Sequence, residues 1–161
     1  MPQPIFRKDY EPSSHLIKTT ELDFNLGDHE TIVSSRIVFY KNPLFTKTVD
    51  ELFLNGESLE LLSIKIDGLD ANYVLKDDGI FLVSPPENFV LEVKVKIHPE
   101  SKTDLNGLYQ SSGNFCTQCE AMGFRQITYY LDRPDVLSVF TTKINADRDQ
   151  YPVLLSNGNL I

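Results

Sequence analysis

The sequence predicts an all-β domain, either an antiparallel β-sandwich or a saddle-like curved sheet, with little helix. Short segments alternate between polar and apolar residues, which is the pattern of half-buried strands. Turn-forming residues separate these segments, and almost no stretch keeps a 3.6-residue period for three turns. The length of 161 residues is sufficient for one hydrophobic core and short for two, so we expect a single domain.

The first predicted element is a hairpin that joins residues 17–26 to residues 31–40. Both segments place apolar residues at every second position, with Leu22, Phe24 and Leu26 in the first. Residues 27–30 begin with a glycine and supply the turn.

Further short strands are expected through the middle of the chain. Asn55-Gly56 is a dipeptide suited to a tight hairpin turn between residues 52–54 and 59–66, although this spacing also allows a longer loop. Residues 89–97 alternate strictly, so one face of that strand should be buried and the other solvated. Other candidate strands are residues 73–75, 80–83, 107–110, 115–121, 136–144 and 152–155.

Composition and charge exclude several classes of partner. Apolar residues make up 41% of the chain and charged residues 24%, which is typical of a folded globular domain. The formal net charge is −8, with 15 basic and 23 acidic residues and no basic stripe, so nucleic acid is not expected. No apolar run approaches the roughly 20 residues that span a bilayer. We therefore expect no membrane partner and a cytoplasmic location.

The most distinctive motifs follow Gly107. They read GLYQS, CTQCEA, GFR, ITYYLDRPDV, FTTKI and YPVLLSNGN, in this order. In sequence and spacing they resemble the N-terminal domain of the aminopeptidase N family of gluzincin zinc metallopeptidases, in its bacterial alanyl-aminopeptidase branch. DYEP at residues 9–12 and LFLNGESLEL at residues 52–61 resemble the family more loosely.

Gln118 and Glu120 are the candidate substrate-binding residues. In an extended strand they share one face, and a carboxylate beside an amide is a suitable receptor for a primary ammonium group. From spacing alone, two solvated side chains on an outer strand are the favoured explanation, because polar pairs on the surface are the norm. The resemblance implies that Glu120 anchors the free amine of a peptide substrate and that Gln118 forms a wall of the first-residue pocket, together with a glutamate of the GAMEN motif in the catalytic domain.

The residues that would hold a catalytic metal are absent from the sequence. Zinc peptidases of this kind need HExxH on a helix, whereas His15, His29 and His98 are far apart and no GAMEN motif is present. We expect no catalytic residue and no bound zinc in this chain, and zinc in a full-length parent. Cys116 and Cys119 form a CxxC motif that could be a redox pair or half a zinc site, but we interpret them as reduced structural cysteines.

Two neighbouring motifs are interpreted as structural. Asp132-Arg133-Pro134-Asp135 resembles a pair of catalytic carboxylates, but its proline and an Asp-Arg contact favour a turn. In Tyr129-Tyr130 the rings should alternate, with one in the core and the other facing a domain interface.

The resemblance implies a domain of an enzyme that releases N-terminal residues from peptides. Residues 1–161 would be its N-terminal β-domain, ending before the last strands of that domain and without the catalytic domain, and would cap the active site. Alone it would be inactive and would expose an unpaired strand edge and an apolar interface that favour self-association. The alternatives are a non-catalytic β-sandwich docking module and an autonomous carbohydrate- or peptide-binding sandwich.

Overall fold

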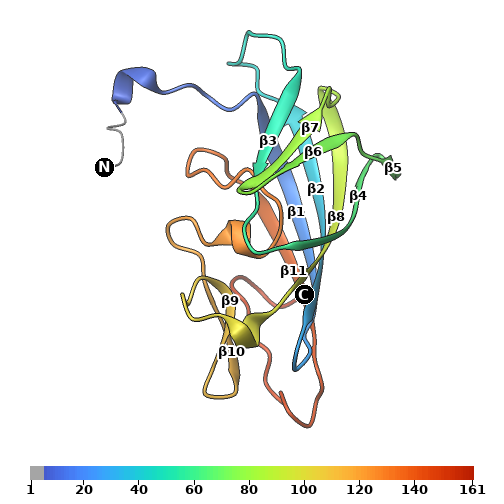
Figure 1. Cartoon of the computed structure of the whole chain (residues 1–161), viewed down its shortest axis with the longest axis vertical. Coiled ribbons are helices and arrows are strands. Elements are labelled where there is room, and N and C mark those ends of the chain that lie inside the picture. The colour runs from blue at the N-terminus through green and yellow to red at the C-terminus, as the bar shows by residue number, and fades with distance from the viewer. Residues whose placement is uncertain (1–5) are drawn as a thin grey trace.

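The structure is a computed structural model that describes residues 6–161, and it confirms the all-β fold class (Figure 1). A six-stranded sheet has the order β11-β1-β2-β8-β4-β5, and a three-stranded sheet has the order β3-β7-β6. Strands β9 and β10 form a separate hairpin. Within residues 6–161 no helix is long and apolar enough to cross a membrane.

The bounds of the elements are as follows. The six-stranded sheet contains β1 (His15–Asn25), β2 (Thr31–Lys41), β4 (Glu60–Ile66), β5 (Leu69–Asp70), β8 (Asn88–Ile97) and β11 (Val139–Asn145). The three-stranded sheet contains β3 (Glu51–Asn55), β6 (Tyr73–Lys76) and β7 (Gly79–Val83). The hairpin contains β9 (Gly107–Ser111) and β10 (Asn114–Gln118), and short 3-10 turns lie at η1 (Arg7–Asp9), η2 (Pro99–Ser101) and η3 (Phe124–Gln126).

The predicted long strands are confirmed. Strands β1 and β2 pair as an antiparallel hairpin, and β8 continues the same sheet beside β2. Every second residue of β8 from Phe89 to Ile97 is buried, while Glu92 and Lys94 are exposed. The strict alternation in the sequence therefore identified the buried face correctly.

One strand pair departs from the predicted antiparallel arrangement. Strand β11 lies along the outer side of β1 in parallel, with Thr19 opposite Val139 and Asn25 opposite Asn145. A parallel pair needs a long connection, and here more than a hundred residues separate the two strands in the chain. The sheet is therefore mixed.

The predicted hairpin at Asn55-Gly56 is wrong. Strand β3 pairs with β7 and strand β4 pairs with β8, so the dipeptide connects two different sheets. A Cβ atom added at Gly56 would lie 2.3 Å from the ring of Tyr129, so the glycine permits close packing. The strand predicted at residues 152–155 is also not formed, and this segment has no regular structure.

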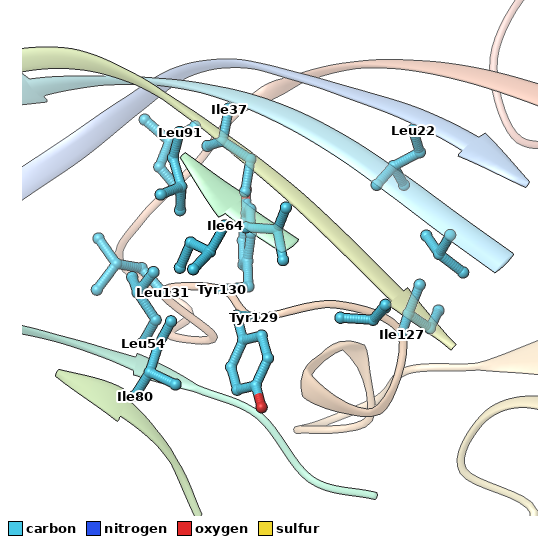
Figure 2. Close-up of a cluster of buried hydrophobic side chains, with 14 of the residues drawn as sticks. Leu22, Ile37, Leu54, Ile64, Ile80, Leu91, Ile127, Tyr129, Tyr130 and Leu131 are labelled. Carbon is cyan, nitrogen blue, oxygen red and sulfur yellow. The ribbon is translucent and has the colours of Figure 1, made fainter. Parts of the chain in front are cut away.

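The main hydrophobic core lies between the two larger sheets (Figure 2). Ile37 and Leu91 enter from the six-stranded sheet, and Leu54 and Ile80 enter from the opposite side. The segment 127–131 runs between these layers, where its backbone pairs with Asn55.

The two tyrosines of this inserted segment are both buried, with 4% of Tyr129 and 5% of Tyr130 exposed. The prediction that one ring faces outward is therefore wrong. The segment is enclosed from two sides, whereas strand alternation assumes a single buried face.

Candidate functional site

The candidate site lies where the β9-β10 hairpin returns to the body of the domain (Figure 1). Strand β10 ends at Gln118, which is paired with Gly107 at the start of β9. The chain then turns through residues 119–123, and the Gly123 amide donates a hydrogen bond to the Cys119 carbonyl at 2.9 Å. This segment, the 119–123 loop, leads directly into η3.

Gln118 and Glu120 come together in a different way from that predicted. Residues 115–121 do not form one strand, because β10 stops at Gln118 and Glu120 belongs to the loop, with a cis peptide bond to Ala121. The Glu120 backbone amide donates to Oε1 of Gln118 at 3.2 Å. Both side chains are exposed. The contact between the two residues therefore joins the Gln118 side chain to the Glu120 backbone.

This arrangement leaves polar groups available for a ligand. The Glu120 carboxylate is solvated and can accept hydrogen bonds from a cation. The side-chain oxygen of Gln118, Oε1, already accepts one hydrogen bond and retains a second lone pair. A carboxylate and an amide oxygen two residues apart can together receive a primary ammonium group.

Two glycines allow the backbone around the loop to pack closely. A Cβ atom added to Gly123 would lie 2.6 Å from the Gln118 carbonyl oxygen and 2.9 Å from Cα of Cys119. Gly107 has a φ of +67°, and a Cβ atom there would lie 2.9 Å from Cβ of Gln126. The backbone on each side of Glu120 is thus in direct contact with β9 and η3.

A polar network supports this packing from behind. Gln126 is 8% exposed, and its side-chain oxygen accepts a hydrogen bond from Lys102. Lys102 Nζ also donates to the Asn106 carbonyl at 2.7 Å, and Gln126 Nε2 donates to Asp104 at 3.2 Å. Partial burial lowers the pKa of Lys102, although nearby acidic groups oppose this change. No sequence pattern indicates this network, because no motif or periodicity links Lys102 to Gln126.

An ion pair joins η3 to the segment that follows the core. Arg125 Nε donates to the Asp132 carboxylate at 2.8 Å, and both side chains are largely buried. Arg133 binds Asp135 through two hydrogen bonds of 2.9 and 2.8 Å, which hold the pKa of Asp135 at about 2. The structural-turn interpretation of Asp132 to Asp135 is confirmed, since both carboxylates are engaged by arginines.

The two cysteines are both free. Cys119 packs against the hydrophobic core, and burial raises the pKa of its thiol, so it does not have the properties of a reactive thiolate.

The described residues do not fit a zinc site. Within residues 6–161 no three His, Cys, Asp or Glu side chains are arranged to hold a metal ion. Buried His15 contacts the Pro86 carbonyl through Nε2, and Nδ1 of His98 contacts the His29 carbonyl.

Comparisons with known proteins agree with this architecture. Residues 13–161 match the family model described as the Peptidase M1 N-terminal domain. The chain is 44% identical over 161 residues to Aminopeptidase N of Escherichia coli (strain K12), covering 99% of this chain and 18% of that protein. It is also 44% identical over 161 residues to Aminopeptidase N of Caulobacter vibrioides, covering 98% of this chain and 18% of that protein. The chain therefore spans about a fifth of the length of these relatives.

Solved structures show the same fold. The crystal structure of Legionella pneumophila aminopeptidase A in complex with aspartic acid matches with a TM-score of 0.89 and 30% identity, over 96% of this chain and 18% of that chain. An M1 zinc metallopeptidase from Deinococcus radiodurans shares the fold with a TM-score of 0.69 and 14% identity, over 83% of this chain and 32% of that chain. From the family match and the whole-chain identity, this chain belongs to the peptidase M1 N-terminal domain family.

Proposed function

We propose that this chain is the N-terminal domain of a zinc aminopeptidase, where it caps the active site and supplies Glu120 as an anchor for the free amine of peptide substrates. The observation that carries this proposal is the exposed Glu120 carboxylate on a closely packed loop, with Gln118 bound to its backbone amide. The 44% identity to two proteins named Aminopeptidase N supports the activity of the longer polypeptide, which we call the parent.

The chemistry of the loop fits an exopeptidase. A substrate ammonium group would donate charge-assisted hydrogen bonds to Glu120, and the Gln118 amide would form one wall of the pocket for the first residue. A peptide with a blocked amine would leave the carboxylate unpaired in a desolvated site, which costs more than the hydrogen bond itself contributes. Selectivity for free N-termini follows from this asymmetry.

The catalytic domain of the parent would provide the zinc and the remaining substrate contacts. Polarisation of the scissile carbonyl and activation of a water molecule would come from zinc held by that domain, and this chain would contribute binding and orientation of the substrate. The outer edge of β11 and its exposed residues Val139 and Phe140 are candidates for the contact with that domain. Free cysteines are in keeping with a cytoplasmic parent.

The test is hydrolysis of an alanyl chromogenic amide by the parent, with and without a zinc chelator. We expect chelation to abolish activity. Glu120→Ala should lower kcat/KM by a factor that corresponds to about 1.5–3 kcal/mol of lost transition-state stabilisation, which is the size of a lost hydrogen bond to a charged group. Gln118→Ala should have a smaller effect. Glu51→Ala, an exposed glutamate on β3, is the matched control and should be silent.

Two outcomes would contradict the proposal. Full activity of Glu120→Ala would reduce this domain to a structural cap. A parent without chelator-sensitive hydrolysis would favour the non-catalytic docking module.

A further inference from the structure

We propose that Lys102 and Gln126 form a positioning pair that holds the 119–123 loop in place, and that Lys102 thereby determines how well Glu120 captures a substrate amine. This inference rests on the proposed function. It concerns residues whose hydrogen bonds join the segment before β9 to η3.

The ammonium group of Lys102 joins two segments across Gly107. It donates to the carbonyl of Asn106, directly before Gly107, and to the side chain of Gln126 in η3. A Cβ atom added to Gly107 would lie 3.3 Å from Lys102 Nζ and 2.9 Å from Cβ of Gln126. Gly107 is therefore held between the two members of the pair.

Gly107 in turn sets the position of both ends of the loop. Gln118, at the first end, is its partner in the β9-β10 ladder. Gly123, at the other end, is so close that an added Cβ atom would lie 3.1 Å from the Gly107 nitrogen. The backbone amide of Gln126 also donates to the Gly123 carbonyl at 3.1 Å. A displacement of Gln126 or Gly107 would consequently move the backbone that carries Glu120.

Charges of opposite sign fix the orientation of the Gln126 amide. Its oxygen faces the Lys102 ammonium group, and its nitrogen donates to the carboxylates of Asp104 at 3.2 Å and Glu57 at 3.5 Å. Uncharged side chains here would stabilise the fold with a smaller desolvation penalty, because a partly buried ammonium group needs hydrogen-bond partners. Here these partners convert a packing contact into a directional one, which suits a loop that must present a carboxylate accurately.

Loss of the ammonium group should therefore weaken capture of the substrate more than the chemical step. In Lys102→Met the Asn106 carbonyl and the Gln126 side-chain oxygen lose their donor, and the loop can relax from its position. We expect KM to rise roughly five- to twentyfold while kcat changes less than about threefold. Lys76→Met, at an exposed position on β6, is the matched control and should leave both constants unchanged.

The deciding experiment is a double-mutant cycle in the full-length parent, with an alanyl chromogenic amide as substrate. Lys102→Met, Glu120→Ala and the double variant are compared for kcat and KM. If Lys102 acts through Glu120, adding Lys102→Met to Glu120→Ala should raise KM no further. An equal rise in KM in both backgrounds would assign Lys102 a general structural role and overturn the inference, as would an unchanged KM in Lys102→Met.

A second variant covers the case in which Lys102→Met does not fold. Asp104→Asn removes the charge of the nearer of the two carboxylates that accept from the Gln126 side chain, and Asp104 is exposed, so folding should tolerate the change. We expect a smaller rise in KM, about two- to fivefold, again only when Glu120 is present. If Glu120→Ala lowers activity while Asp104→Asn and Lys102→Met do not, the inference about the positioning pair is refuted and the proposed function stands. If Glu120→Ala has no effect, the proposed function fails first.

Discussion

Replacement of Gly123 by alanine tests whether the backbone of the 119–123 loop must be packed as closely as the structure shows. Gly123 has φ of −86° and ψ of −14°, which alanine adopts without strain. The new Cβ atom would nevertheless lie 2.6 Å from the Gln118 carbonyl oxygen and 2.9 Å from Cα of Cys119. Both are backbone atoms, so no side-chain rotation can relieve the contact.

The size of the effect follows from the distance by which the loop must move. An ordinary contact between non-bonded heavy atoms is about 3.5 Å, so the loop and Gln118 must separate by nearly 1 Å. Misplacement of a substrate-binding group by about 1 Å can cost on the order of a hundredfold in rate. We expect Gly123→Ala to lower kcat/KM of the parent by 10- to 100-fold, or about 1.4–2.7 kcal/mol.

Steady-state hydrolysis of an alanyl amide, together with urea unfolding of the same variants, measures this effect. Gly113→Ala is the control, because Gly113 lies in the turn of the same hairpin with φ of +80° and nothing within 4 Å of an added Cβ atom. That variant should lose about 1–2 kcal/mol of stability and keep its kcat/KM. Equal kinetics for Gly123→Ala and the unmodified parent would refute the close-packing argument, and equal losses in both variants would show that stability alone is responsible.

Two further predictions concern the stability of the chain itself. Leu54→Ala should lower the free energy of unfolding by about 2–5 kcal/mol in urea titrations, because Leu54 is fully buried, whereas Leu69→Ala, at 75% exposure, should change it by less than about 0.5 kcal/mol. Burial lowers the pKa of His15, so the unfolded chain takes up a proton first as the pH falls through about 6.5, and stability should decrease from there toward the folded-state pKa. His15→Gln should lose less stability than the unmodified chain between pH 7.5 and 5; parallel curves would show that His15 is not responsible.

The candidate site residues could be proposed from the sequence, but their geometry could not. Gln118 and Glu120 were identified from spacing and from resemblance to a family, on the assumption of one continuous strand. Strand β10 ends at Gln118 and Gly123 packs closely against that residue, a contact that strand periodicity does not predict. The hydrogen bond from Lys102 to Gln126 could likewise not be predicted from the sequence, because the two residues are 24 positions apart.

The strand pairings likewise divide into those that the local sequence predicts and those that it does not. The β1-β2 and β6-β7 hairpins were predictable, because a short turn brings adjacent strands together at little entropic cost. Asn55-Gly56 gave the same local signal but connects two sheets, because β3 pairs with β7 and β4 pairs with β8. A turn dipeptide specifies a change of direction and does not specify which strand will be the neighbour.

The sequence by itself determined the all-β class, the positions of the long strands, the buried face of β8 and the structural character of the Asp132 to Asp135 turn. These features depend on alternation and on local backbone preferences, which act over a few residues. Only the tertiary structure decided the parallel placement of β11 beside β1, the burial of both tyrosines in the segment 127–131, and the packing behind Glu120. These depend on contacts between distant parts of the chain, and a local pattern records that a side chain is buried without recording what buries it.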